Sequence, residues 1–282
     1  MRNLGKSGLI VYNIGMSKNI KAAGGRRVKK KKLLILAIIL VIAAVVYLNR
    51  AYSHIYEVIG RANLKPVDGQ ETYIINGMAT NTAAVATSSL VYSSLGDSLT
   101  AGAGVNNPQE SLPYLLAERF SGGDKTIILK NHSFPGIGTA DIIKTFLPAA
   151  LADNPDIVTL LIGVNDIHNK VSAADFAANY EEIIRSLKQG TKAKIYIINI
   201  PFIGSDKLML PPYQALFDAR TREFNKIIRS LAAKYSVKYV DLYSSTAELF
   251  KSSGDHYSLD SFHPSASGYK LWADIIYDNI NN

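Results

Sequence analysis

Five short runs of apolar residues, separated by stretches with a helical period, restrict the fold of this 282-residue chain more than any other feature. Runs of this length without polar alternation suit strands that are buried on both faces of a sheet. The runs cover residues 90–95, 126–129, 157–163, 194–200 and 237–242. Their alternation with helices predicts a three-layer α/β/α fold around a mainly parallel, five-stranded sheet.

Three segments between or after these runs carry apolar residues at helical spacing, which predicts one buried face on each helix. The residues are Phe176, Tyr180, Ile183, Ile184 and Leu187 in the first segment, Phe224, Ile227, Ile228 and Leu231 in the second, and Tyr269, Trp272 and Ile276 in the third. Ser265 is the predicted N-cap of the last helix, because a serine hydroxyl can accept a hydrogen bond from the first turn.

An uncharged apolar run at residues 33–48 follows directly after the basic sequence RRVKKKK. As a helix, this run would extend about 24 Å, a little less than the ~30 Å hydrocarbon core of a membrane. Lys32 and Arg50 can reach the interface on either side and make up the difference. We therefore predict an uncleaved transmembrane signal anchor, with residues 1–32 in the cytoplasm and the chain after Arg50 outside the cell membrane. A cleaved signal peptide and a buried helix of a soluble protein are the alternatives.

Positive charge is concentrated in the first 32 residues. The chain has 31 basic and 23 acidic residues, and ten of the basic residues but no acidic residue lie in residues 1–32. The remaining 21 basic residues do not outnumber the 23 acidic ones, so we exclude a nucleic-acid partner despite the net charge of +8. The absence of cysteine excludes disulfide bonds, thiolate metal sites and a cysteine nucleophile.

The parts outside the apolar run differ in composition. Residues 1–32 show neither a helical nor a strand period, and we predict a disordered tail. Residues 49–88 are predicted to be a linker, in which only 72–76 are typical of a strand and 79–89 form a spacer of small residues. Residues 89–282 are the predicted α/β domain.

Small and polar residues follow three of the predicted strands, at the sheet edge where the active sites of parallel α/β proteins lie. Residues 96–99 (Gly-Asp-Ser-Leu) would present the hydroxyl of Ser98 in a tight turn. Gly136 would let the backbone approach a substrate and offer its N–H, with Thr139 as a candidate helix cap. Asn165 would add an amide donor after the third strand. Each sequence also occurs in ordinary turns, so none identifies a site alone.

Near the C-terminus, His263 follows Asp260 by three residues and precedes Pro264, whose ring restrains the residue before it. A carboxylate at this spacing can bind one ring nitrogen of the imidazole and leave the other facing outward. His263 is the only one of the five histidines that combines a nearby aspartate with a loop entering a helix.

These four sequences together resemble the SGNH, or GDSL, hydrolase family. The matching blocks are Gly96-Asp97-Ser98-Leu99, Asn131 through Gly136, Gly163-Val164-Asn165-Asp166 and Asp260-Ser261-Phe262-His263-Pro264. The resemblance covers roughly residues 90–280 and implies a flavodoxin-like arrangement of the sheet. Nothing in residues 1–89 belongs to the family pattern.

The resemblance implies a Ser-His-Asp triad that acts on carboxylic esters. Ser98 is the predicted nucleophile, His263 its base, and Asp260 the residue that orients the imidazole. The predicted oxyanion hole consists of the N–H of Ser98, the N–H of Gly136 and the side-chain amide of Asn165. Gly138 is an alternative to Gly136 as donor. We predict no cofactor and no metal, because no His/carboxylate cluster stands apart from these residues.

The family implies small-molecule or polymer-bound esters as substrates. A domain anchored outside the membrane through residues 33–48 would meet acetylated envelope glycans or lipid esters, so we predict an extracytoplasmic serine esterase that hydrolyses or transfers acyl groups. Leu208, Met209, Leu210 and Tyr213, in residues 202–217, are either a flap for an acyl chain or part of a loop that packs on the core.

Two other classes of protein remain. A catalytically inactive glycan-binding module would keep the fold but would have little reason to keep Ser98, Asp260 and His263 together. A phosphate-binding protein is suggested by the glycines of residues 96–104, but the P-loop pattern G-x-x-x-x-G-K-[ST] is missing.

Overall fold

The computed structural model describes residues 12–61, 71–75, 89–122, 125–252 and 254–281, with side chains of the first helix described from Lys29 to Ile59. The chain divides into two units, Met1–Ala51 and Tyr52–Asn282. The second unit contains the sheet and the predicted site residues, and the first contains most of one long helix.

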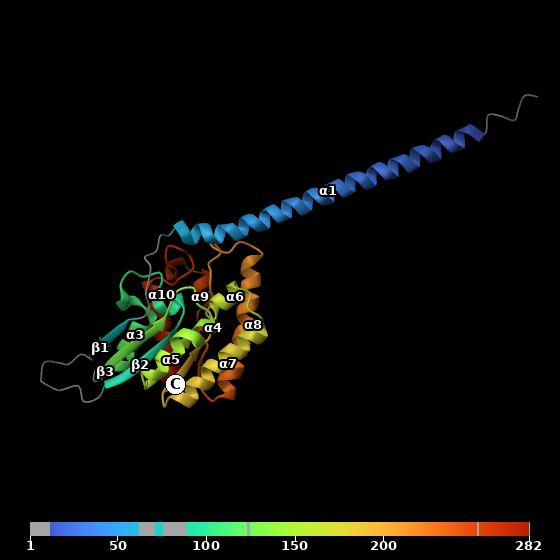
Figure 1. The fold of residues 1–282 in the computed structure, drawn as a ribbon. Helices are drawn as coiled ribbons and strands as arrows, with labels where there is room; N and C mark the ends of the chain where they lie inside the picture. Colours follow the sequence, from blue (N-terminus) through green and yellow to red (C-terminus); the bar gives the residue numbers. More distant parts are fainter. Residues whose placement is uncertain (1–11, 62–70, 76–88, 123–124, 253, 282) are drawn as a thin grey trace, which may run out of the picture. The chain divides into compact units, whose positions relative to one another are not determined.

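A six-stranded sheet forms the centre of the second unit (Figure 1). Its strands are β1 (Thr72–Ile75), β2 (Ser89–Gly96), β3 (Thr126–Ser133), β4 (Ile157–Leu161), β5 (Lys194–Ile198) and β6 (Lys238–Val240), in the order β1-β3-β2-β4-β5-β6. The last five are the predicted strands, and they pair in parallel. The additional strand, β1, pairs antiparallel with β3, so part of the predicted linker belongs to the sheet.

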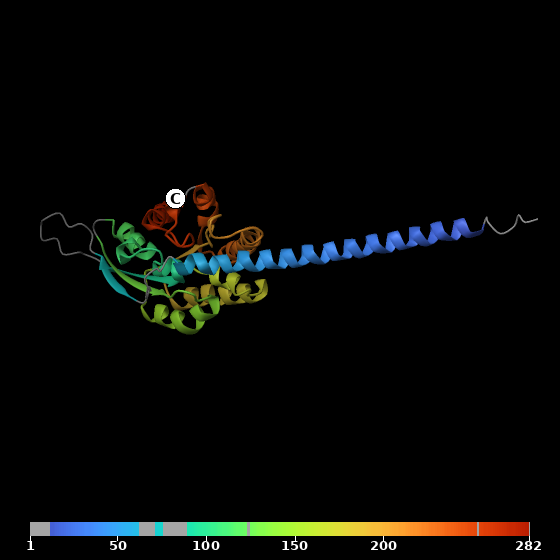
Figure 2. The same ribbon diagram turned by 90° about the horizontal axis from the view of Figure 1, so that it is seen from above.

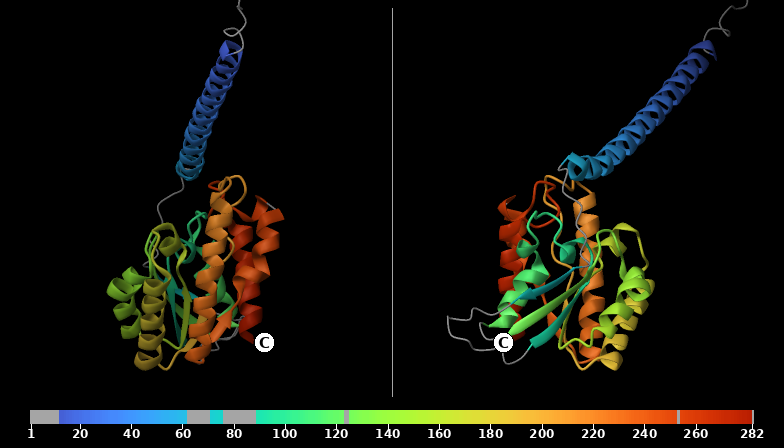
Figure 3. Two further views of the ribbon diagram at one scale, coloured as in Figure 1. Left: turned by 90° about the vertical axis from the view of Figure 1, so that its right-hand side faces the viewer. Right: turned by 60° about the vertical axis from the view of Figure 1, so that its left-hand side comes forward.

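Helices cover the sheet on both faces, which confirms the predicted three layers (Figure 3). They are α2 (Ser98–Ala101), α3 (Leu112–Ser121), α4 (Thr139–Asp141), α5 (Leu147–Ala152), α6 (Val164–His168), α7 (Ala173–Gly190), α8 (Tyr213–Lys234), α9 (Leu242–Ser252) and α10 (Ala266–Asn281). Short 3-10 helices lie at η1 (Pro108–Glu110) and η3 (Gly254–His256), and a π-helical turn at η2 (Ile142–Phe146) joins α4 to α5. Helices α3 and α10 pack together on one face, whereas α5 and α7 lie on the other and α8 packs against α7 and β6.

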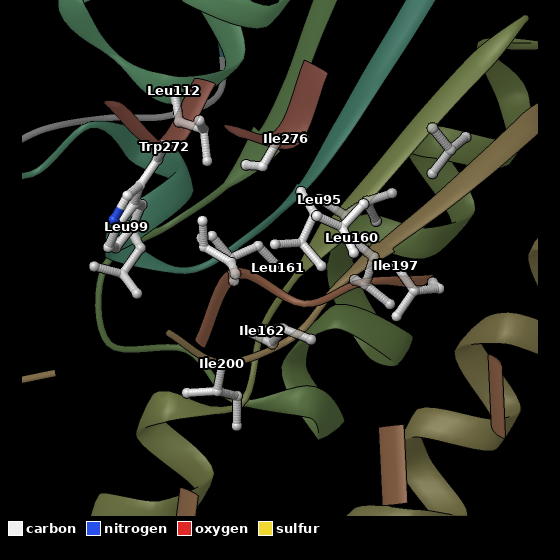
Figure 4. Close-up of a cluster of buried hydrophobic side chains, with 14 of the residues drawn as sticks. Leu95, Leu99, Leu112, Leu160, Leu161, Ile162, Ile197, Ile200, Trp272 and Ile276 are labelled. Carbon is white, nitrogen blue, oxygen red and sulfur yellow. The ribbon is translucent and has the colours of Figure 1, made fainter. Parts of the chain in front are cut away.

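The core confirms the predicted helical faces. The five predicted core residues of α7 are all buried, as are Phe224, Ile228 and Leu231 of α8, while Ile227 is half-buried. Figure 4 shows Leu95, Leu160 and Ile197 from three adjacent strands in the same buried cluster as Trp272 and Ile276 of α10. Ser265 caps α10 as predicted, because its Oγ accepts a hydrogen bond from the N–H of Gly268 at 3.3 Å.

The strand order creates a switch point between β2 and β4. From β2 the chain crosses to β3 on one side, and then returns past β2 to β4 on the other. The loops that leave β2 and β4 therefore diverge, and ligands of open α/β sheets bind in the crevice that such loops form. Ser98 follows β2 and Asn165 follows β4, so two predicted site residues lie at this point. Figure 2 shows the sheet edge-on between the helical layers.

The long helix α1 (Tyr12–Arg61) contains the predicted transmembrane run. The most apolar 18-residue window of its segment Lys29–Ile59 has a mean hydropathy of 2.6 and is not buried, so by length and composition this segment can cross a membrane. A signal sequence near the N-terminus would have the same properties. The prediction of disorder is wrong for residues 12–32, which are helical; residues 1–11 and the predicted spacer at 76–88 lie outside the described residues.

Candidate active site

The corner after β2 holds Ser98 at the start of α2, where the chain turns out of the sheet. A Cβ on Gly96 would lie 2.0 Å from Oγ1 of Thr100 and 2.4 Å from the carbonyl oxygen of Leu161. Only glycine fits this close approach between the turn and β4. The Asp97 side chain then caps α2 by accepting a hydrogen bond from the N–H of Leu99 at 3.0 Å. The sequence before Ser98 is thus explained by the sterics of the turn.

The structure brings Ser98, His263 and Asp260 together as one hydrogen-bonded series. The Nε2 atom of His263 lies 2.9 Å from Oγ of Ser98, and its Nδ1 atom lies 2.5 Å from Oδ2 of Asp260. Both distances are within the range for hydrogen bonds. With the proton on Nδ1, the imidazole donates to Asp260 and its Nε2 accepts from the hydroxyl of Ser98.

The loop between η3 and α10 fixes the carboxylate of Asp260. Its Oδ1 accepts hydrogen bonds from the backbone N–H of Phe262 and of His263, each at 2.9 Å, and from the hydroxyl of Ser258 at 2.7 Å. Burial alone would raise the pKa of Asp260, but the hydrogen bond and charge of His263, together with these other donors, hold the pKa below its usual value. The carboxylate therefore stays ionised beside the imidazole at neutral pH.

Asn165 lies in the first turn of α6, two residues after Gly163, which is the N-cap of this helix. Gly163 has a φ of +129°, a backbone conformation that residues with a Cβ rarely adopt, and this favours glycine at the position. The Nδ2 atom of Asn165 donates to the carbonyl oxygen of Ile137 at 2.9 Å. An amide nitrogen carries two hydrogens, and this bond uses one and fixes the direction of the other.

Gly136 and Gly138, the two candidate donors after β3, differ in their surroundings. The N–H of Gly138 donates to Oδ2 of Asp141 at 3.0 Å. Gly136 is exposed, has a φ of +86°, and has no described atom within 4 Å of the position its Cβ would take. Because the N–H of Gly138 is already used in a hydrogen bond, Gly136 is favoured as the donor, in agreement with its spacing from Asn131.

Asp97 and Asp166 are two buried carboxyl groups beneath the candidate site. Burial raises the pKa of Asp97 to about 7; the N–H of Leu99 acts in the opposite direction, and the charge of Asp166 raises the pKa further. Oδ2 of Asp97 has no hydrogen-bond partner among the described residues. Burial also raises the pKa of Asp166, against the hydrogen bonds from Thr139.

Three contacts at this edge were not predicted from the sequence. Ser258 donates to Asp260, and Gly104, with a φ of +102°, lies so close to the last loop that a Cβ would be 2.4 Å from the carbonyl oxygen of Pro264. Thr139, a predicted cap, instead begins α4 and donates its hydroxyl and its N–H to Asp166. The contacts of Gly104 and Thr139 join residues that are distant in sequence, and the contact of Ser258 with Asp260 corresponds to no sequence motif.

The apolar side chains of residues 202–217 differ in burial: Leu210 and Tyr213 are half-buried and Leu216 is exposed. Leu208 and Met209 are buried, and Met209 closes over Gly204, whose Cβ would lie 2.8 Å from the methionine methyl group. These two side chains therefore do not line an open cleft in this structure, in line with the alternative of a loop packed on the core.

Two further features of the described residues bear on the site. No group of three or more histidine or acidic side chains among them is arranged to hold a metal ion. A cavity of about 810 Å³ lies at the amino ends of the strands, between residues that include Leu90, Asp156 and Lys194. It is at the opposite sheet edge from Ser98 and belongs to no arrangement of catalytic groups.

A serine, a histidine and an aspartate in a hydrogen-bonded series, at the switch point of a three-layer α/β/α fold, are the arrangement of serine hydrolases. The sequence profile of the GDSL-like lipase/acylhydrolase family matches residues 94–271, which is more than half of the chain. The protein belongs to this family of ester hydrolases.

Solved structures agree on the fold. The crystal structure of the lipase/acylhydrolase from Enterococcus faecalis is similar with a TM-score of 0.56 and 24% identity, over 68% of this chain and 95% of that chain. Axe2, an acetylxylan esterase from Geobacillus stearothermophilus, is similar with a TM-score of 0.54 and 18% identity, over 68% and 94% of the two chains. A comparison with curated protein sequences gives no match.

Proposed function

We propose that this protein is a membrane-anchored serine esterase in which Ser98 is the nucleophile, His263 the general base and acid, and Asp260 the residue that orients the imidazole. The observation that carries the proposal is the unbroken series of hydrogen bonds from Asp260 through His263 to Ser98. A free serine hydroxyl is a poor nucleophile, and a neighbouring base is what activates it. An inactive glycan-binding module would not need this series.

In the first step, Oγ of Ser98 attacks the carbonyl carbon of the ester while its proton passes to Nε2 of His263. The imidazolium is stabilised by the ionised carboxylate of Asp260. The carbonyl oxygen becomes an oxyanion, bound by the N–H groups of Ser98 and Gly136 and by the second amide hydrogen of Asn165. One such donor stabilises the transition state by about 3–4 kcal/mol.

The tetrahedral intermediate then loses the alcohol. The bond from carbon to the leaving oxygen breaks, and Nε2 of His263 returns its proton to that oxygen. Water next attacks the acyl-serine, gives a proton to the same nitrogen, and the acid leaves as Ser98 recovers its hydroxyl hydrogen. If an acceptor alcohol takes the place of water, the same groups transfer the acyl group.

We further propose that the acyl group is short, with acetyl esters of envelope glycans as the substrates rather than long-chain lipid esters. Of the four residues considered as a flap, Leu208 and Met209 are buried and do not offer an apolar wall to an acyl chain, whereas Leu210 and Tyr213 are half-buried. The fold is shared with an acetylxylan esterase, which supports this choice without deciding it, since it is also shared with a lipase/acylhydrolase.

The test compares p-nitrophenyl acetate and p-nitrophenyl octanoate as substrates of the full chain in detergent micelles. The proposal predicts that kcat/KM is at least tenfold higher for the acetate, and that acetate is released from an acetylated glycan polymer. A preference for the octanoate would instead support lipid esters as the substrates.

We propose that α1 anchors the enzyme with residues 1–32 in the cytoplasm and the catalytic domain outside. The ten basic residues before the apolar run support this orientation, because basic residues favour the cytoplasmic side. The chain has no cysteine, so single-cysteine variants can report topology. An impermeant maleimide added to intact cells should label Glu248→Cys, whose side chain is exposed, but not Lys6→Cys. The reverse pattern would refute the orientation, and loss of Lys6→Cys from the mature chain would indicate cleavage.

A further inference from the structure

The buried carboxylate of Asp166 is bound almost entirely by one residue on a different loop. The N–H of Thr139 lies 3.0 Å from Oδ2 and 3.2 Å from Oδ1, and the hydroxyl of Thr139 lies 2.5 Å from Oδ1. The Nδ2 atom of Asn179 on α7 donates to that hydroxyl at 3.1 Å and so fixes its direction. Among the described residues, no lysine or arginine forms an ion pair with Asp166.

This contact joins the two loops that carry the proposed oxyanion donors. Asp166 follows Asn165 directly, and Thr139 lies three residues after Gly136. A second hydrogen bond, from Asn165 to the carbonyl oxygen of Ile137, joins the same loops. The loops also approach closely at Gly138, where a Cβ would be 3.0 Å from Oδ2 of Asp166. The relative position of Gly136 and Asn165 therefore depends on contacts across 27 residues of sequence.

A buried carboxylate without a cationic partner is costly, because it loses its hydration and gains only neutral hydrogen bonds. The charge of Asp141 raises the pKa of Asp166 beyond the effect of burial, and the charge of Asp166 in turn raises the pKa of Asp97. A neutral side chain of similar size would fill the space at a lower desolvation cost. What the carboxylate adds is two acceptor oxygens that hold both the N–H and the hydroxyl of Thr139 at once.

We propose that Asp166 and Thr139 are positioning residues that hold the donors of Gly136 and Asn165 at the separation that the oxyanion requires. The inference rests on the proposed function, since it assigns these two residues a role only through the oxyanion hole. Donors must lie about 2.7–3.1 Å from the oxyanion, and they act mainly in the transition state. Misplacement by about 1 Å can lower a rate about 100-fold, so loss of the contact should reduce kcat and leave KM nearly unchanged.

The test uses four variants of the full chain with p-nitrophenyl acetate. Thr139→Val keeps the shape of the side chain but removes the hydroxyl, whereas Thr139→Ser keeps the hydroxyl. Asp166→Asn keeps one acceptor oxygen and removes the other. Thr159→Val is the matched control, because Thr159 is also a buried threonine whose hydroxyl has side-chain hydrogen-bond partners, but it lies within β4 and contacts neither loop.

The expected result is that Thr139→Val and Asp166→Asn lower kcat about 10- to 100-fold with KM changed less than about threefold. Thr139→Ser should stay within about threefold of the unchanged protein, and Thr159→Val should lower the unfolding temperature but not kcat. In an Asn165→Ala background, Thr139→Val should lower kcat by a much smaller factor, since one of the two donors that Thr139 positions is already absent.

Full kcat in folded Thr139→Val and Asp166→Asn would overturn the inference, and so would an undiminished effect of Thr139→Val in the Asn165→Ala background. A loss of kcat shared equally by Thr159→Val would point to stability alone. Failure of the proposed function would give a different result. The Ser98→Ala variant would then hydrolyse the ester as fast as the unsubstituted chain, whatever the effect of the Thr139 variants.

Discussion

The Nε2 atom of His263 lies 2.9 Å from Oγ of Ser98, although 165 residues separate the two in sequence. The contact forms because β2 is a central strand and the loop before α10 returns to its carboxyl end. Gly104 makes this return possible, since the backbone of Pro264 fits against it only without a Cβ. The nucleophile and its base are thus brought together by the topology of the sheet and by one glycine.

Asp260→Asn should lower kcat by about 10⁴-fold, because an amide can donate to Nδ1 and favour the wrong tautomer of His263. The thermal unfolding temperature should change much less than the activity. Ser258→Ala should lower kcat much less than Asp260→Asn, since it removes one donor to Asp260 and leaves the contact of Asp260 with His263. Steady-state kinetics with p-nitrophenyl acetate measure both, and equal losses in the two variants would refute the role of Asp260.

Asn165→Ala should lower kcat about 10²- to 10³-fold with a small change in KM, since its amide is proposed to bind the oxyanion and not the ground-state ester. Kinetics over a full range of substrate concentration separate the two parameters. If only KM rises, Asn165 binds substrate and is not part of the oxyanion hole.

Gly104→Ala should reduce both stability and kcat, because its Cβ would lie 2.4 Å from the carbonyl oxygen of Pro264 and 3.0 Å from Cβ of His263. Gly122→Ala is the matched control. Gly122 also has a positive φ, of +55°, but no described atom lies within 4 Å of its Cβ position. In this control, backbone strain should lower the free energy of unfolding by about 1–2 kcal/mol, and kcat should not change. Unchanged activity in Gly104→Ala would mean that the last loop does not depend on this contact.

Asp97→Asn should change how stability depends on pH. Burial raises the pKa of Asp97 from its usual 3.8 to about 7, so between these values the folded chain holds a proton that the unfolded chain releases. The contribution of Asp97 to stability is therefore present below about pH 4 and is lost as pH rises to about 7, by at most about 4 kcal/mol. Denaturant unfolding of both proteins from pH 4.5 to 7.5 measures this. The stability of Asp97→Asn relative to the unsubstituted protein should rise with pH, and parallel curves would contradict the raised pKa.

The parallel strands and the buried helix faces could be predicted because their signals are local. Val158 and Leu160 lie in a mostly apolar run without polar alternation, which is typical of a strand buried on both faces of a sheet. The four site sequences could also be predicted, since each combines residues that a tight turn and a reactive group both need. Their meeting at one sheet edge follows from the parallel topology.

The remaining features depend on contacts that no local pattern encodes. The strand signal at residues 72–76 is local and β1 occupies Thr72–Ile75, but its antiparallel pairing with β3 is set by the long-range register Thr72↔Lys130. The contact of Asp166 with Thr139 joins two loops, each of which looks like an ordinary turn. The helix at residues 12–32 was missed because its sequence lacks an apolar period, although lysine, alanine and arginine favour helices and the apolar run that follows extends it.

The most direct test of the central claim is the reaction of Ser98. The full chain and its Ser98→Ala variant are each treated with a serine-directed phosphonate, measured by intact mass, and assayed with p-nitrophenyl acetate. We predict turnover and a single adduct in the unsubstituted protein, and loss of both in a variant that unfolds at a similar temperature. Retained turnover or an adduct in folded Ser98→Ala would show that another residue is the nucleophile and would contradict the account.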